Sequence, residues 1–209
     1  MILAAGMGRR LGRLTERSTK CMVWLNGRRL IEHTLDALAE TAVARVVIVV
    51  GHGADELRSF VGPTWRGLPV AYVENSDFAR TNNVYSLLLA GKEMARDDTL
   101  VIESDVVFDP RILHRLLAEP APNVAVVARF EPWMDGTVTV LDEARSIVRF
   151  VSRDEFRWDE SGRYFKTVNI YKLSRDFLSG RFLPFLETYV RTHGVEAYYE
   201  QVLDRKSVV

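Results

Sequence analysis

The chain has 209 residues, 47% of them hydrophobic, which is enough for one domain with a substantial core. Lysine plus arginine and aspartate plus glutamate both number 28, so no net charge favours bulk binding of nucleic acid. No apolar run approaches the ~20 residues that cross a bilayer, and the single cysteine, Cys21, excludes an internal disulfide. We therefore expect a cytoplasmic protein with neither a nucleic-acid nor a membrane partner.

Alternating strand and helix patterns fill the chain as far as about residue 130. The run RVVIVV at residues 45–50 is apolar and largely β-branched, which is typical of a strand buried on both faces. Apolar residues recur at helical spacing between such runs, and Asn82 is placed to cap one helix. The expected elements are strands at 2–5, 45–50, 69–73, 99–102 and 124–128, with helices near 31–39, 57–61, 82–94 and 110–117. This order predicts a doubly wound α/β sheet made mainly of parallel strands.

The pattern changes after residue 130, where strands follow one another without long helices between them. The expected elements are strands at 136–141, 146–151 and 164–173, then helices near 183–192 and 194–204. Closely spaced strands predict a small antiparallel extension of the sheet. With no internal repeat and no linker, residues 1–209 are expected to form a single domain.

The stretch LAAGMGRRLGRLTERSTK, residues 3–20, combines glycines and cations directly after the first expected strand. Glycines at the carboxyl edge of a parallel sheet let the backbone approach a phosphate. Gly6, Gly8 and Gly12 are spaced one residue too widely for a dinucleotide fingerprint, and no Walker lysine follows. The cations are Arg9, Arg10, Arg13 and Lys20. Several cations suit a triphosphate whose pyrophosphate must leave with its charge.

LAAGMGRRL…TERSTK resembles the signature L-A-A-G-x-G-x-R-L…T…P-K of nucleotidyltransferases, which join a nucleoside triphosphate to a phosphorylated small molecule. The resemblance implies a Rossmann-like nucleotidyltransferase fold. Arg10 and Lys20 match the signature arginine and lysine, so the resemblance implies that both are catalytic. Thr19 replaces the usual proline, and we expect this change to loosen the turn. The nucleotide-binding positions implied by the match are Leu3, Ala5, Gly6, Gly8 and Arg9.

The segment ESDVVFD, residues 103–109, follows a strand that is expected to be buried. A carboxylate at such a strand end can hold Mg²⁺ against a phosphate oxygen. The resemblance implies that Asp105 is a metal ligand and that the cofactor is Mg²⁺. Asp109 is interpreted as the cap of the next helix, and Glu103 is given no role.

The segment RTNNVYSL, residues 80–87, is similar to N-N-x-Y-S-L in phosphocholine cytidylyltransferases. The amides of Asn82 and Asn83 are suited to reading the edge of a base or ribose. The match therefore implies that CTP is the nucleotide and that both asparagines bind it.

Four later segments resemble the cytidylyltransferases of phosphonate metabolism, which activate 2-aminoethylphosphonate or 2-hydroxyethylphosphonate as CMP esters: EPWMDGTV, YFKTVNIYKLS, PFLETYV and AYYEQVL. The resemblance implies an acceptor site with Trp133 and Asp135 at its far end and Lys166 facing the anion. Asn169 joins the same face only if the strand is irregular, because a regular strand groups positions 166, 168 and 170. Asp135 is suited either to an ammonium or to a hydroxyl on the acceptor.

The function implied is transfer of CMP from CTP to a small phosphonate with release of pyrophosphate, and the arginine-rich composition favours antibiotic biosynthesis. Phosphocholine is an alternative acceptor, for which Trp133, Tyr164 and Tyr171 would supply an aromatic cage. A glycosyltransferase with a similar fold and a non-catalytic nucleotide-binding module are further alternatives.

Relatives of this kind carry a second acidic metal site in an E-x-D stretch beyond the last helix, and the sequence ends at Val209 before such a stretch. Glu200 and Asp204 are the nearby carboxylates, and the helical pattern is interpreted as turning both toward solvent. We therefore expect the sequence to be a piece of a larger bifunctional protein with a second catalytic domain.

Overall fold

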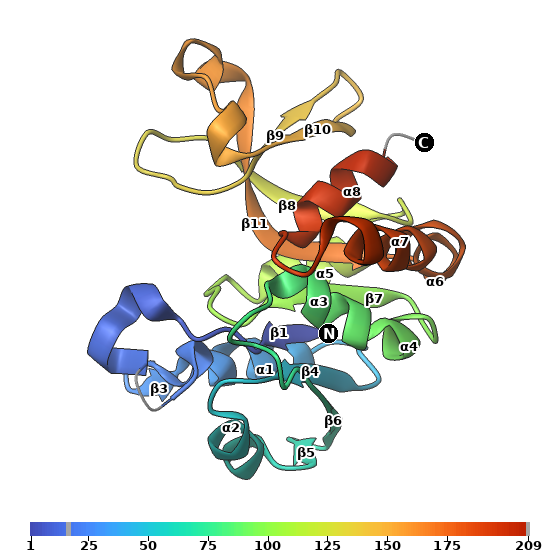
Figure 1. Ribbon diagram of the computed structural model, residues 1–209. Helices are drawn as coiled ribbons and strands as arrows, with labels where there is room; N and C mark the ends of the chain where they lie inside the picture. Colours follow the sequence, from blue (N-terminus) through green and yellow to red (C-terminus); the bar gives the residue numbers. More distant parts are fainter. Residues whose placement is uncertain (16–17, 208–209) are drawn as a thin grey trace.

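The computed structural model describes residues 1–15 and 18–207, and its centre is a sheet of nine described strands (Figure 1). In spatial order these strands are β10 (Ile147–Val151), β9 (Val138–Leu141), β11 (Tyr164–Leu173), β7 (Thr99–Glu103), β1 (Ile2–Ala4), β4 (Val46–Val50), β6 (Leu68–Glu74) and β5 (Thr64–Trp65), while β8 (Val124–Arg129) pairs with β11. Strands β7, β1, β4 and β6 are parallel to one another, and the remaining pairs are antiparallel. This arrangement confirms a mixed sheet with a parallel centre and an antiparallel extension. A short hairpin of β2 (Trp24–Leu25) and β3 (Arg28–Arg29) lies apart from it.

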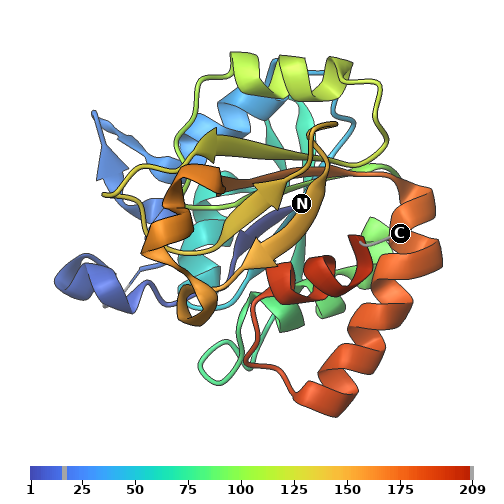
Figure 2. The same cartoon turned by 90° about the horizontal axis from the view of Figure 1, so that it is seen from above.

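Helices cover both faces of the sheet, as a doubly wound fold requires (Figure 2). One face carries α1 (Leu30–Ala39), α2 (Ala54–Val61) and α5 (Arg111–Ala118); the other carries α3 (Asn83–Leu89), α4 (Gly91–Met94), α6 (Arg175–Phe177), α7 (Leu183–His193) and α8 (Tyr199–Ser207). Alternation along β1 explains the two cores, because Ile2 and Ala4 pack with the first group of helices whereas Leu3 packs with the second. Among the described residues, no helix is long and apolar enough to cross a membrane.

The strand expected at residues 124–128 is confirmed, but it does not pair with another strand of the parallel group. This segment forms β8, whose partner is β11 in antiparallel register. Because β11 is itself antiparallel to β7, β8 runs in the direction of the parallel strands but hydrogen-bonds to none of them. The pairing therefore depends on a strand that lies about forty residues further along the chain.

Two helices also differ from their expected lengths. The expected helix over 82–94 is divided into α3 and α4 next to Gly91, where a Cβ would lie 3.3 Å from Leu183 of α7. The expected helix over 194–204 begins only at Tyr199, because Gly194 ends α7 with a φ of +86°. Asn82 does cap α3, and its side-chain oxygen accepts a hydrogen bond from the Asn83 backbone N–H.

Strand β11 changes its neighbour along one edge. Its first half pairs with β9 through residues 164–166 and its second half pairs with β7 through residues 170–173, while β8 follows the opposite edge. The register shifts between Thr167 and Tyr171, and Asn169 lies there with a φ of +59°. This is the irregularity on which the placement of Asn169 depended. The bulge separates β9 from β7 and leaves a gap at the edge of the parallel strands.

Candidate active site

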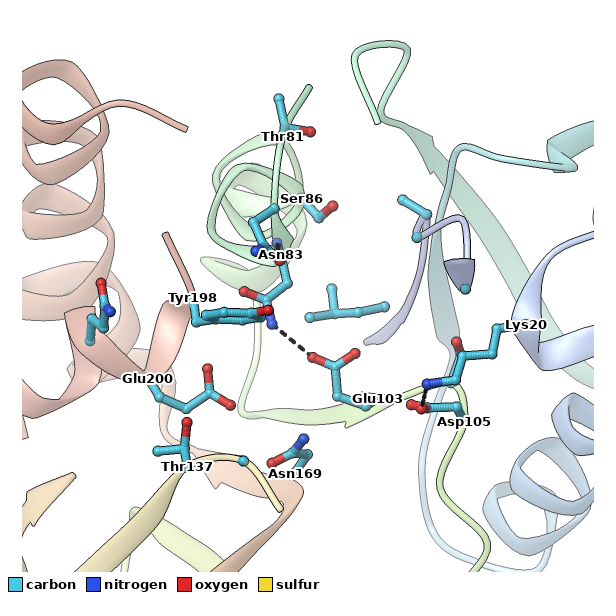
Figure 3. A pocket seen from close by; sticks show the side chains of 18 of the residues that line it. Lys20, Thr81, Asn83, Ser86, Glu103, Asp105, Thr137, Asn169, Tyr198 and Glu200 are labelled. Carbon is cyan, nitrogen blue, oxygen red and sulfur yellow. Dashed lines mark hydrogen bonds and ion pairs between the residues drawn. The ribbon is translucent and has the colours of Figure 1, made fainter. Parts of the chain in front are cut away.

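A cleft of about 1160 Å³ opens at the carboxyl ends of β1 and β7 and extends to the bulged strand β11 (Figure 3). Helices α3 and α8 and the β9–β10 hairpin supply its remaining walls. The predicted residues that line it are Leu3, Ala5, Gly6, Gly8, Arg9, Lys20, Asn82, Asn83, Asp105, Asp135, Lys166 and Asn169. Segments from five parts of the sequence therefore meet in one cavity, as expected for the edge of a doubly wound sheet.

The glycine-rich loop runs from β1 into two 3₁₀ segments, η1 (Arg9–Thr15) and η2 (Lys20–Met22). Gly8 has a φ of +60°, a conformation that favours glycine. The hydroxyl of Thr19 donates a hydrogen bond of 3.1 Å to the carbonyl of Ala4, and Thr19 is fully buried. The expectation that threonine loosens this turn is therefore wrong, since its side chain ties the loop to β1.

Lys20 and Asp105 form an ion pair across the floor of the cleft (Figure 3). Lys20 comes from the end of the glycine-rich loop, and Asp105 follows β7 by two residues. The two positions are 85 residues apart in sequence, yet the structure brings their side chains into contact. Arg9 also lines the cleft, whereas the side chain of Arg10, the other predicted catalytic cation, lies outside the described part of the structure.

Asn83 holds two neighbouring elements in place. Its amide nitrogen donates a hydrogen bond of 3.1 Å to the carboxylate of Glu103, and its amide oxygen accepts one of 3.0 Å from the Tyr199 backbone N–H. Asn82 uses its amide oxygen to cap α3. Both asparagines line the cleft, but these internal bonds leave little of Asn83 free for a ligand. Their contact with a nucleotide stays a prediction.

The predicted acceptor residues divide into three that line the cleft and one that does not. Lys166 and Asn169 both line it because the bulge in β11 turns the two side chains toward the same cavity. Asp135 is exposed at its rim. Trp133 is 80% exposed and lies outside the cleft lining, so its expected place in the pocket is wrong.

The aromatic cage considered for choline does not form. Tyr164 is buried beside Val138 and Val151, and Tyr171 packs edge-on against Tyr199 with ring centroids 5.7 Å apart. Both rings therefore belong to hydrophobic cores and are absent from the cleft lining. With Trp133 also outside the cleft, the three aromatic side chains do not enclose a common space.

Glu200 is a cleft residue that the sequence pattern placed in solvent. It is 5% exposed and lies at the start of α8, which packs against β10, α3 and α7. The apolar residues Tyr199, Val202 and Leu203 mark the buried stripe of this helix, and Glu200 flanks that stripe on the side of the cleft. Asp204 also lines the cleft, and its carboxylate accepts a hydrogen bond of 2.5 Å from a β10 backbone N–H. The solvent-facing interpretation of both residues is therefore wrong.

Burial shifts the proton affinities of the groups in the cleft. Burial, together with the negative charges of Glu200 and Asp105, raises the pKa of Glu103 to about 8. Burial raises the pKa of Glu200 to about 7, although Lys166 opposes the shift. Burial also lowers the pKa of Lys166, against the opposing charges of Glu200 and Asp135. Shifted pKa values of this kind are common at sites that bind charged ligands.

A family model described as the MobA-like NTP transferase domain matches residues 1–198. The chain belongs to this family. The match covers the glycine-rich loop, the Lys20–Asp105 pair and the β11 side of the cleft. It decides against a glycosyltransferase and confirms the resemblance to nucleotidyltransferases.

Curated relatives of this NTP transferase include two enzymes named for phosphonates. The CMP-5'-(3-aminopropyl)phosphonate synthase of Streptomyces rubellomurinus is 37% identical over 202 residues, which are 96% of this chain and 32% of that protein. The 2-aminoethylphosphonate cytidylyltransferase of Lancefieldella rimae is 29% identical over 149 residues, which are 71% of this chain and 58% of that protein. The chain thus spans less than two thirds of the length of each. The choline-phosphate cytidylyltransferase of Streptococcus pneumoniae is 36% identical over 108 residues, half of this chain and 43% of that protein.

Solved structures of other NTP transferases share the fold. The CTP:phosphocholine cytidylyltransferase of Streptococcus pneumoniae superimposes with a TM-score of 0.76 at 20% identity, covering 98% of this chain and 82% of that one. The inositol-1-phosphate CTP transferase of T. maritima gives a TM-score of 0.76 at 20% identity, covering 98% and 78%. At this identity the likeness establishes the α/β architecture and its antiparallel extension.

Proposed function

We propose that this NTP transferase moves a cytidylyl group from CTP to a small phosphonate and releases pyrophosphate. The observation that carries the proposal is the single cleft in which the Lys20–Asp105 pair faces the Lys166 and Asn169 side of β11. One side is suited to a triphosphate and the other to an anionic acceptor. The two relatives named for phosphonates support the same acceptor class.

In the proposed reaction a phosphonate oxygen attacks the α-phosphorus of CTP. A new P–O bond forms, the bond from the α-phosphorus to the bridging oxygen breaks, and its electron pair leaves with pyrophosphate. The phosphonate is already an anion near neutral pH, so no strong general base is required. The task of the protein is to hold two anions together in line and to neutralise the charge that develops.

The glycine-rich loop, Arg10, Lys20 and Lys166 each have a place in this scheme. Backbone N–H groups near Gly6 and Gly8, together with Arg10, hold the β- and γ-phosphates. Lys20 neutralises the α-phosphate as it becomes five-coordinate. Lys166 attracts the phosphonate from the side of β11.

Mg²⁺ is the proposed cofactor, and the carboxylates at the end of β7 fit it. Asp105 and Glu103 present oxygen ligands of the kind that Mg²⁺ prefers, and this ion is commonly held by one or two carboxylates plus substrate phosphates. The ion would supply charge neutralisation at the phosphates when it is bound.

We also propose a cellular location, a pathway type and a second domain. Use of CTP points to a cytoplasmic location, and a phosphonate acceptor is compatible with antibiotic biosynthesis. A second catalytic domain would account for the greater length of the first relative, of which this chain spans 32%.

Phosphocholine is the second candidate acceptor. The relative named for choline phosphate and the superimposed CTP:phosphocholine enzyme favour it. The cleft disfavours it, because the tyrosines that would surround a quaternary ammonium are buried in the two cores.

The test is release of pyrophosphate from the purified protein with CTP and Mg²⁺. The acceptors are 2-aminoethylphosphonate, 3-aminopropylphosphonate, 2-hydroxyethylphosphonate and phosphocholine, and each is repeated with UTP and ATP. We expect turnover with a phosphonate and CTP, and loss of turnover in the Lys20→Ala protein. No pyrophosphate with any phosphonate would contradict the proposal, and faster turnover with phosphocholine would favour the second candidate.

A further inference from the structure

Glu200 is a buried carboxylate of the cleft, and only part of it is hydrogen-bonded within the protein. Its side chain comes from the first turn of α8 and is 5% exposed. Within the described part of the chain, its Oε2 atom has no hydrogen-bond partner. Figure 3 shows Glu200 and Glu103 extending toward one space, which Thr137 and Asn169 bound on the side of the antiparallel strands. The unpartnered oxygen of Glu200 is therefore available to a ligand bound in the cleft.

The nearby lysine does not neutralise this carboxylate by contact. Lys166 donates hydrogen bonds of 2.8 Å to the carbonyl and 3.3 Å to the hydroxyl of Thr167. Among the ion pairs of the described residues, none joins Lys166 to Glu200. Glu103, the other deep carboxylate, already accepts a hydrogen bond from Asn83. Within the described residues, Glu200 thus differs from Glu103 in keeping one carboxylate oxygen without a hydrogen bond.

A buried carboxylate without a partner costs free energy unless a cation or a proton reaches it. In the proposed function Mg²⁺ is held by Asp105 and Glu103 at the end of β7, which leaves Glu200 without a proposed cation. An alkylammonium carries one positive charge and three N–H donors, which suits one carboxylate that lacks a hydrogen bond. A hydroxyl group would supply a donor but would leave the charge unbalanced.

We propose that Glu200 binds the ammonium group of an aminoalkylphosphonate acceptor, so that the protein selects an amine over the corresponding alcohol. This inference rests on the proposed function, in which the phosphonate end of the acceptor lies toward Lys20 and Lys166. The sequence suggested that Asp135 contacts the far end of the acceptor, but Asp135 is exposed at the rim. We assign this contact to Glu200, which is buried in the cleft.

The test compares kcat/KM for 2-aminoethylphosphonate and 2-hydroxyethylphosphonate, with saturating CTP and Mg²⁺. We expect the wild-type protein to prefer the amine by roughly 10- to 100-fold, the worth of one charge-assisted hydrogen bond. Glu200→Gln keeps the shape of the side chain and removes its charge, and we expect this preference to fall to about threefold or less because only the amine loses its ionic partner. Glu196→Gln removes an exposed charge outside the cleft and is expected to leave the preference unchanged.

The outcomes separate this inference from the proposed function. Turnover with the alcohol equal to or better than with the amine would overturn the role of Glu200 while leaving the cytidylyltransferase intact. An equal loss for both acceptors in Glu200→Gln would do the same. Release of no pyrophosphate with either acceptor would instead refute the proposed function. Circular dichroism checks that each variant is folded. If Glu200→Gln does not fold, the kcat/KM preference of the wild-type protein and its calorimetric affinities for the two acceptors test the inference instead.

Discussion

Replacing Glu200 with glutamine is expected to stabilise the free protein, and to do so only at higher pH. Burial raises the pKa of this carboxyl from 4.5 to about 7. Below pH 4.5 the group is protonated in both the folded and the unfolded chain and contributes no difference. As the pH rises from 4.5 through 7, the unfolded chain loses the proton first, so the free energy of unfolding falls.

The size of the effect follows from the two pKa values. The difference between 4.5 and about 7, at about 1.4 kcal/mol for each pH unit, corresponds to about 3 kcal/mol. Glutamine does not ionise, so Glu200→Gln removes this loss. The gain in stability of the variant over the wild type is therefore expected to grow by about 3 kcal/mol between pH 4.5 and pH 8.

Urea unfolding at pH 4.5, 5.5, 6.5 and 8, followed by circular dichroism, measures this difference. Glu196→Gln is the matched control, because its carboxylate is exposed and its stability profile is expected to run parallel to that of the wild type. Parallel profiles for Glu200→Gln and the wild type would refute the argument that Glu200 is an unneutralised buried acid. A variant less stable than the wild type at pH 8 would show that the carboxylate is held by the protein for structural reasons.

Three further predictions concern the cleft and its scaffold. Lys20→Ala and Asp105→Ala are each expected to lower kcat by about 10²- to 10³-fold while the far-ultraviolet spectrum is unchanged, because each removes a preorganised charge; near-normal turnover or general unfolding would contradict their assignment. Asn83→Ala is expected to lower the free energy of unfolding in urea by about 1–3 kcal/mol, since a carboxylate and a backbone N–H lose their partner; an unchanged midpoint would contradict this. Gly51→Ala is expected to lower the melting temperature, because a Cβ there would lie 2.8 Å from a backbone oxygen, whereas Gly180→Ala meets nothing within 4 Å and is expected to be tolerated; equal melting temperatures for the two variants would be inconsistent with this packing.

The sequence predicted those site residues that belong to short local sequence patterns. Lys20 ends a glycine-rich loop and Asp105 follows a buried strand, so the positions of both relative to the parallel sheet follow from the fold class. The place of Asn169 could be predicted only conditionally. Strand periodicity puts it on the opposite face from Lys166 unless the strand is irregular. The structure supplies that irregularity.

The parts that the sequence did not predict depend on contacts between distant segments. Glu200 is buried because α8 packs against β10 and α3, and a helical pattern shows which side is apolar but not what covers its flanks. The side-chain hydrogen bond of Thr19 to Ala4 joins positions fifteen residues apart and has no periodic signature. The neighbour of β8 is fixed by β11, which follows later in the chain.

Because β11 pairs with β9 in one half and with β7 in the other, substitutions can change one side of the cleft without changing the other. One end of this strand is anchored in the parallel layer beside β7, and the other end carries the β9–β10 hairpin. Mutations that reshape the hairpin can therefore change the β11 side of the cleft while β7 and β1 keep their hydrogen-bonded framework. Lys166 lies opposite Val138 in the half of β11 that pairs with β9, so its position depends on the hairpin.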